Sequence, residues 1–171
     1  MELCSTAIIR KKSKRKRASP ILQLLSINPL LSSAILSWFL AQVLKTILDS
    51  IRAGELCLKR FWETGGMPSS HSATVCALAA SAAFREGIGS SAFALSVILA
   101  TVVMYDAMGI RQAAGVHARE INEIKKQLGD GEDGDLPEKL GHRPIEVISG
   151  AFLGIFLAWL VCMIIVPAAA A

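Results

Sequence analysis

The sequence predicts an all-α integral membrane protein, a bundle of about four transmembrane helices with an amphipathic helix at the membrane interface. Of its 171 residues, 53% are hydrophobic, and the mean hydropathy is +0.49. A helix that faces lipid must be apolar on its outer side as well as its inner side, which accounts for such a composition. Long apolar segments alternate with polar ones, and the polar residues suited to chemistry lie near the segment ends. The length fits a single domain.

Residues 1–20 form a basic N-terminal arm that we expect to be disordered, and residues 21–171 form the membrane domain. Seven basic residues lie between Arg10 and Arg17, shortly before the first long apolar segment. That position favours a cytoplasmic anchor to anionic lipid, with a nuclear-localisation signal or a transit peptide as alternatives. Because the rest of the chain is slightly acidic, the basic arm does not indicate a nucleic-acid partner.

Four apolar segments are the predicted spans, at 29–48, 72–84, 91–105 and 144–166. The first has about 20 residues, which matches a hydrocarbon core of about 30 Å, and Lys45 near its end can extend its stem to the interface. The second is short and rich in alanine and serine. Small residues suit close contact between membrane helices, and a re-entrant segment packed against protein is the alternative.

Between the third and fourth spans, apolar residues recur at helical spacing over 111–128, which predicts an amphipathic helix at the interface. The residues on this stripe are Ala114, His117, Ile121, Ile124 and Leu128. The acidic run GDGEDGDLP follows. Its carboxylates do not match the spacing of a calcium-binding loop, so we interpret it as a solvated linker.

The four cysteines indicate neither a metal site nor a disulfide framework, because they contain no CxxC pair. Cys76 and Cys162 lie inside apolar segments. We expect both to be small buried side chains, and we expect no metal ion or other cofactor.

Four spans that alternate across a membrane place the ends of the first and third on the same face as the starts of the second and fourth. All three histidines of the chain fall on this face. The polar residues expected there are Lys45, Arg52, Ser69, Ser70, His71, Asp106, Arg111, His117, His142 and Arg143. The positive-inside rule puts the arm in the cytoplasm and this face on the lumenal or external side. Ionisable residues near membrane helix ends are often functional, although each cation alone also fits an ordinary interfacial position.

This combination of residues suits phosphate chemistry. The glycine-rich turn 65–70 can present backbone N–H groups at the start of the second span, which makes an anion site. Lys45, Arg52 and Arg111 can hold the remaining phosphoryl oxygens. One histidine can attack phosphorus while another protonates the leaving oxygen, and such a reaction needs no metal ion.

The segments GGMPSSHSAT, MYDAMGIRQAAGVHA and LGHRPIEV make the chain similar to the phosphatidic acid phosphatase type 2 / vanadium-dependent haloperoxidase superfamily. Over residues 29–166 it most closely resembles the divergent branch of small membrane proteins labelled acid phosphatase/vanadium haloperoxidase-related. The superfamily signature has three parts. Lys45 and Arg52 keep the spacing of the first part, residues 68–71 read PSSH where the second reads PSGH, and Arg111 and His117 keep the spacing of the third.

The resemblance implies a role for each matching residue. His117 is the implied nucleophile, which forms a phosphohistidine, and His71 is the implied general acid. The implied phosphate-binding residues are Lys45, Arg52 and Arg111, with help from Ser69 or Ser70 and nearby amides.

Besides Ser70 in place of a glycine, three side chains depart from the signature: Ala53 replaces a proline, Ile110 a serine, and Ile121 the aspartate that follows the nucleophile. That aspartate normally fixes the tautomer and orientation of the histidine. Glu120, one residue earlier on the helix, or Asp106 can take its place.

Each candidate also has a structural interpretation. His71 fits a helix cap or a core position, and His117 fits the apolar stripe of its helix. His142 fits an interface position ahead of Pro144, which suits the first turn of the fourth span. Asp106 fits equally well as an ion-pair partner of Arg111.

Two functional hypotheses from different classes follow. The first is a membrane phosphatase that hydrolyses a lipid or isoprenoid phosphate monoester or diphosphate through a phosphohistidine, with membrane lipids around it and the substrate entering laterally. The second is a non-catalytic membrane protein with a degenerate phosphate pocket that binds a lipid headgroup or scaffolds a partner. Ile121 favours the second hypothesis, and the intact spacing of the basic residues and histidines favours the first. Vanadate-dependent halide oxidation is a distant third.

Overall fold

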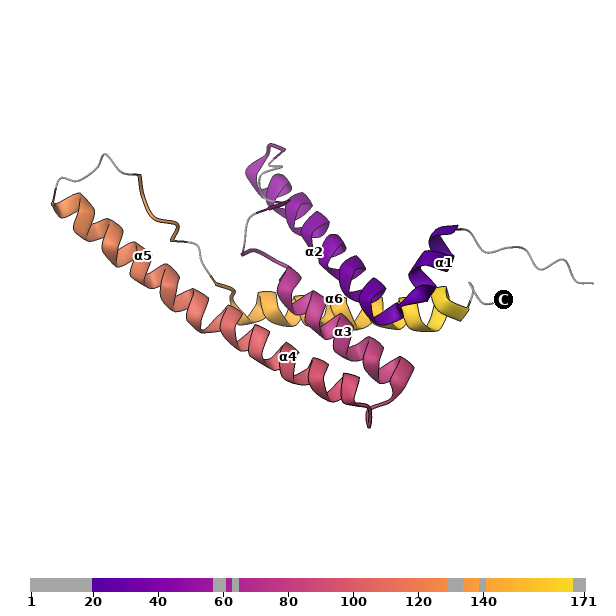
Figure 1. The fold of residues 1–171 in the computed structure, drawn as a ribbon. Coiled ribbons are helices and arrows are strands. Elements are labelled where there is room, and N and C mark those ends of the chain that lie inside the picture. The colour runs from indigo at the N-terminus through magenta and orange to yellow at the C-terminus, as the bar shows by residue number, and fades with distance from the viewer. Residues whose placement is uncertain (1–19, 57–60, 63–64, 129–133, 139–140, 168–171) are drawn as a thin grey trace, which may run out of the picture.

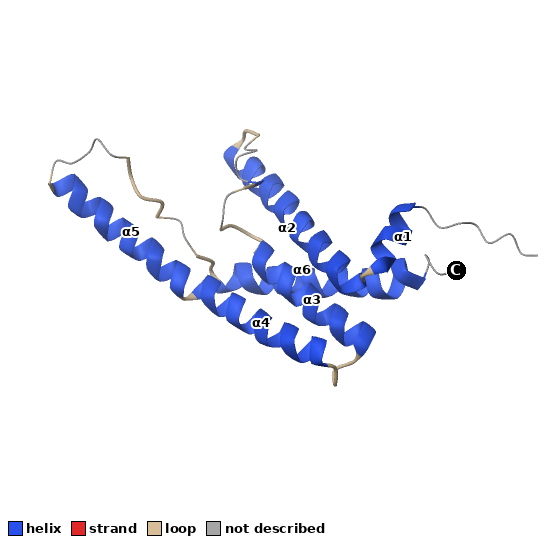
Figure 2. Ribbon diagram, viewed as in Figure 1, coloured by secondary structure: helices blue, strands red, loops and turns tan. Residues whose placement is uncertain are grey.

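The computed structural model describes residues 20–56, 61–62, 65–128, 134–138 and 141–167. Within these residues the fold is all-helical, with no strand (Figures 1 and 2). The helices are α1 (Pro20–Ile27), α2 (Pro29–Ala53), α3 (Ser70–Glu86), α4 (Ser91–Met108), α5 (Ile110–Gln127) and α6 (Pro144–Leu160), and a π-helical turn, Val161–Ile165, extends α6. The predicted basic arm lies outside the described residues, apart from Pro20, which begins α1.

The prediction of an all-α membrane bundle is confirmed. Among the described residues, three helical stretches are long and apolar enough to cross a membrane: Pro29–Ala53, Ser91–Gln127 and Pro144–Ile165. The second of these joins α4 and α5. The predicted span 72–84 lies within α3, which has 17 residues and is therefore about 26 Å long. That length falls slightly short of a hydrocarbon core of about 30 Å.

Helix α3 is the central element, because it packs against α2, α4 and α6. Its buried side chains are small: Ser70, Ser72, Ala73, Val75, Cys76, Ala77, Ser81 and Ala82. Small side chains allow helix backbones to approach closely in a membrane. The alanine and serine content that shortens the apolar signal of this segment is therefore what lets three helices surround it. Cys76 and Cys162 are buried and free, as expected.

Two glycines on α6 make the closest approach in the bundle. A Cβ atom at Gly150 would overlap the backbone oxygen of Ser69, and one at Gly154 would overlap the backbone oxygen of Ala73. The two glycines are four residues apart and so lie on one face of α6. This small-x3-small pattern sets the first half of α3 directly against α6.

The predicted amphipathic helix 111–128 corresponds to α5. Helix α4 ends at Met108, with Gly109 as its C-cap, and α5 then continues away from the other helices of the bundle (Figure 1). The chain returns from α5 to α6 in a segment that we call the strap, of which residues 134–138 and 141–143 are described. Asn122, 1% exposed, holds the strap to α5: its side chain donates to the backbone oxygen of Leu136 (2.9 Å) and accepts from the Leu136 N–H (2.8 Å).

The described part of the acidic run is therefore solvent-exposed, as expected of a solvated linker. The interpretation as a linker did not include its hydrogen bonds to α5. The same side chain, Asn122, also donates to the Glu138 carboxylate at 2.8 Å. A single asparagine on the polar side of an amphipathic helix follows no periodic pattern, so its partner cannot be read from the sequence. Residues 129–133 of the acidic run lie outside the described part of the chain.

Candidate functional site

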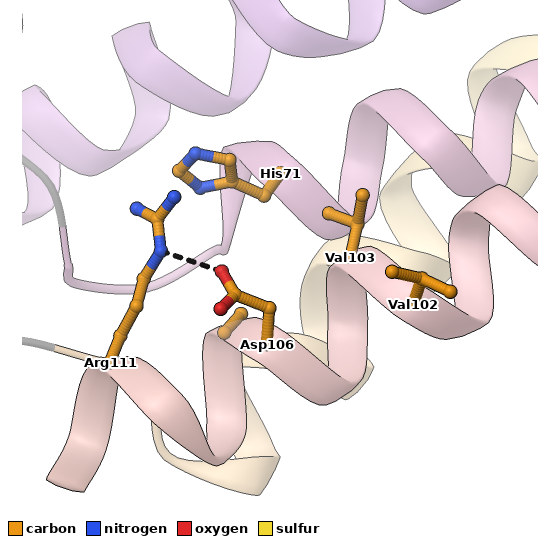
Figure 3. Close-up of a pocket in the computed structure, with 6 residues that line it drawn as sticks. His71, Val102, Val103, Asp106 and Arg111 are labelled. Carbon is orange, nitrogen blue, oxygen red and sulfur yellow. Dashed lines mark hydrogen bonds and ion pairs between the residues drawn. The ribbon is translucent and has the colours of Figure 1, made fainter.

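Polar side chains from α2, α3, α4, α5 and the strap lie together at one end of the bundle. A cavity of about 260 Å³ opens there, between the first turn of α3 and the junction of α4 with α5 (Figure 3). The residues that line it are His71, Val102, Val103, Asp106, Ala107 and Arg111. One wall is thus apolar and contributed by α4, and the opposite side carries a histidine and a guanidinium group.

His71 is positioned by the turn that precedes α3. Ser69 is the N-cap of α3 and fully buried, and its hydroxyl oxygen accepts from the Ser72 hydroxyl at 3.1 Å. The Ser69 N–H donates to the backbone oxygen of Glu146 on α6 at 3.0 Å. Ser70, also buried, accepts the Thr74 hydroxyl at its backbone oxygen (2.7 Å). These bonds fix the start of α3 against α6, and His71 with it.

Lys45 lies beneath the same turn. Gly65 and Gly66 have φ of +92° and +90°, a region that L side chains rarely adopt. A Cβ atom at Gly66 would sit 3.1 Å from Cδ of Lys45, so the backbone of the turn covers the lysine stem. The Lys45 side chain is accordingly buried, at 3% exposure. A buried ammonium group must be compensated by other charged or polar groups, and Asp49, one turn further along α2, also lies beside Gly66.

Arg111 turns back toward the pocket from the first turn of α5. Its Nε donates to Oδ2 of Asp106 at 3.0 Å, and the guanidinium group points toward the His71 ring (Figure 3). The side chains of this ion pair are 43% and 36% exposed, so solvent screens it and it stabilises the fold by at most about 1 kcal/mol. A ligand anion can therefore compete with Asp106 for Arg111 at little cost.

The charged groups that act on His71 come from four elements. Arg111 and Lys45 are positive, His142 adds positive charge when it is protonated, and Asp106 opposes them. The balance of charge favours an anion beside His71. Among the described residues, no group of three or more His, Cys, Asp or Glu side chains is placed to hold a metal ion.

His142 is the histidine that the structure brings to His71. Their ring centroids are 5.9 Å apart, and His142 is 5% exposed. Its backbone N–H donates to the backbone oxygen of Ala107 (3.0 Å), and its ring Nδ1 lies 3.1 Å from Oε2 of Glu146. Sequence reasoning gave His142 a minor place and overlooked Glu146. The signal that was available is the spacing of a histidine and a glutamate four residues apart, across a proline that begins a helix.

The other predicted site residues lie away from the pocket. His117 is exposed on α5. In an α-helix a side chain six residues on is rotated by about 240°, so His117 and Arg111 leave α5 in different directions. Glu120 is also exposed on α5. Arg52 is exposed in the last turn of α2, where it pairs with Asp49 at 3.6 Å.

Comparisons with known proteins give the chain a family context. The family described as the Divergent PAP2 family matches residues 26–157, from the end of α1 into the last turn of α6. The chain is also similar to the uncharacterised membrane protein YuiD of Bacillus subtilis (strain 168), with 40% identity over 150 residues that cover 80% of this chain and 94% of that protein. No solved structure matches.

Proposed function

We propose that this chain, which belongs to the divergent PAP2 family, is a membrane phosphatase that hydrolyses a lipid or isoprenoid phosphate monoester or diphosphate. The observation that carries the proposal is the position of His71. It lines a pocket at the end of an apolar helical bundle, where the positive charges of Arg111 and Lys45 act on it. A histidine beside two cations is suited to transferring a proton to or from a bound phosphate ester.

Each part of the pocket has a task in this reaction. Arg111 binds phosphoryl oxygens with its planar fork of N–H donors, in place of the Asp106 carboxylate. His71 protonates the oxygen of the leaving group. Val102 and Val103 form the apolar wall, and Val102 is 60% exposed on the outer side of α4. A hydrocarbon tail entering from the bilayer would therefore meet apolar surface up to the edge of the charged site.

The reaction also needs a nucleophile, and a second histidine would form the phosphohistidine intermediate. The family resemblance assigns that role to His117. We further propose that the site faces the lumen or the exterior and that the basic arm is cytoplasmic, as the positive-inside rule indicates.

The test is phosphate release by the purified full-length protein in detergent or nanodiscs, without added metal, on a panel of lipid phosphates and prenyl diphosphates. We expect release by the wild type, inhibition by vanadate, and loss in His71→Ala. Ile98→Ala, an exposed position on α4, is the matched control for the change to alanine. Absence of release on every substrate, from protein that unfolds cooperatively on heating, contradicts the proposal.

One alternative has a specific observation in its favour. Ile121 stands where the superfamily has an aspartate, which suits a pocket that binds a phosphorylated headgroup without hydrolysing it. Under this alternative, inorganic phosphate or vanadate binds the protein and His71→Ala weakens binding, but no phosphate is released from any substrate.

A further inference from the structure

We propose that His142, held by Glu146, is the histidine that attacks phosphorus. This inference rests on the proposed phosphatase function and reassigns one step of it, because the family resemblance implies His117 for that role. The observations that lead to it are the contact between the His142 and His71 rings and the carboxylate partner of His142.

Several contacts along the strap hold His142 beside His71, which lines the pocket. Asn122 fixes the strap to α5 through Leu136. Further along the strap, Gly141 has φ of +85°, and a Cβ atom there would come within 2.6 Å of the backbone nitrogen of Gln112. The backbone N–H of His142 then donates to the backbone oxygen of Ala107, a residue that lines the cavity. The position of His142 is therefore set by backbone contacts with α4 and α5.

Glu146 determines which nitrogen of His142 is free to react. An ionised carboxylate only accepts hydrogen bonds, and Oε2 of Glu146 already accepts from the Arg143 N–H at 3.2 Å. Nδ1 of His142, 3.1 Å from the same oxygen, must therefore carry the hydrogen of the neutral ring, which leaves a lone pair on Nε2. This assignment follows from the hydrogen-bond pattern. A carboxylate in this place also orients the ring and stabilises the charge that develops on it.

His117 has none of these features. It is exposed on α5, and the residue four positions later is Ile121, so the helix offers no carboxylate where the His142–Glu146 spacing supplies one. Arg111, which the resemblance pairs with His117, leaves α5 in a different direction. The described structure thus provides one histidine that is buried, oriented by a carboxylate and next to His71, and that histidine is His142.

The reaction is balanced with these two histidines and water. The Nε2 lone pair of His142 attacks phosphorus, and an N–P bond forms as the P–O bond to the leaving group breaks. His71, protonated beside the anionic substrate, gives its proton to the leaving oxygen. A water molecule then attacks phosphorus and gives a proton to His71, the N–P bond breaks with its electron pair returning to Nε2, and inorganic phosphate departs.

The experiment measures phosphate release by the full-length protein with four variants: His142→Ala, Glu146→Gln, His117→Gln and Ile148→Ala. Ile148 is an exposed residue of α6 and serves as the matched control. We expect His142→Ala to lower kcat by at least about 10³-fold, on the scale seen when a nucleophile is removed. Glu146→Gln should lower kcat by up to about 10⁴-fold with little change in KM, because an amide can stabilise the wrong tautomer.

Two further measurements separate catalysis from folding. Added imidazole should restore part of the phosphate release of His142→Ala, which a purely structural histidine would not allow. Acid-labile, alkali-stable labelling from a radioactive substrate should be present in wild type and His117→Gln and absent in His142→Ala.

Each outcome has one meaning. Activity and labelling that survive in folded His142→Ala and disappear in His117→Gln overturn the proposal and leave the phosphatase function intact. If His142→Ala does not fold, Glu146→Gln decides: full activity in the folded variant overturns the proposal, and a lower kcat at unchanged thermal stability supports it. No release by the wild type on any substrate contradicts the phosphatase function itself, and the nucleophile assignment with it.

Discussion

The strap can be released by one substitution that leaves the pocket residues unchanged, Asn122→Ala. The Asn122 side chain makes three hydrogen bonds to the strap, two with the backbone of Leu136 and one with Glu138. At about 0.5–1.5 kcal/mol each, they stabilise the attached state by about 1.5–4.5 kcal/mol. Leu136 and Glu138 are exposed, so water replaces part of each bond, and we expect about 1.5–2.5 kcal/mol. Because 1.4 kcal/mol is a factor of ten in an equilibrium constant, the equilibrium constant for detachment of the strap from α5 should increase about 10- to 60-fold.

Hydrogen exchange of the strap measures this opening directly. We expect exchange of the Leu136 amide to accelerate by that factor in Asn122→Ala, while amides of α3 exchange at the wild-type rate. Asn122→Asp is the informative second variant, since it keeps the acceptor for the Leu136 N–H but places a carboxylate against the backbone oxygen of Leu136 and the Glu138 carboxylate. It should open the strap at least as much. Unchanged exchange of Leu136 in both variants would refute the argument that Asn122 holds the strap.

Three further predictions test other parts of the structure. Gly154→Val should lower the free energy of unfolding by at least about 2 kcal/mol, because its side chain would overlap the backbone of α3, whereas the exposed Ile155→Ala should not; thermal unfolding in detergent compares them, and equal stability contradicts the close packing. Asp106→Asn should tighten vanadate binding by up to about fivefold in calorimetric titration, since it frees Arg111 from a partly exposed pair; weaker binding would mean that Asp106 positions Arg111 for the ligand. With the native cysteines replaced, a cysteine introduced at exposed Ile88 should react with membrane-impermeant maleimide added on the cytoplasmic side of the membrane, and one at exposed Leu128 only with reagent on the opposite side; the reverse pattern contradicts the proposed orientation.

Much of the fold could be predicted because its causes are local in the sequence. The apolar run 29–48 and the periodic stripe of 111–128 each report a helix without reference to any other part of the chain, and α2 and α5 confirm them. The role of Gly150 and Gly154 could not be predicted in this way. A glycine permits close packing only where a particular partner approaches. The sequence of α6 does not indicate that this partner is the backbone of Ser69 and Ala73.

The same distinction between local and long-range causes applies to the residues of the candidate site. The alternation of helices across a membrane was enough to predict that His71, Asp106 and Arg111 meet, because it determines which helix ends share a face. The same alternation places His142 on this face, but its packing against the His71 ring depends on Asn122 and Ala107, which act on the strap from two different helices. No periodicity in the sequence carries that information.

His117 illustrates that a motif spacing does not by itself bring the motif residues together. Helix α5 begins at Ile110, so Arg111 and His117 lie on one continuous helix, on sides about 120° apart. The helix predicted over 111–128 already contains both residues, so this separation follows from the periodicity of the sequence and not from the motif spacing. A catalytic histidine is defined by its distance to the reacting group and by the carboxylate that orients it, and unrelated chain orders achieve the same arrangement in other enzymes. The His142 ring lies beside His71 and has a carboxylate partner in Glu146. We therefore expect the chemistry to depend on His142 and Glu146, and position 117 to tolerate substitution.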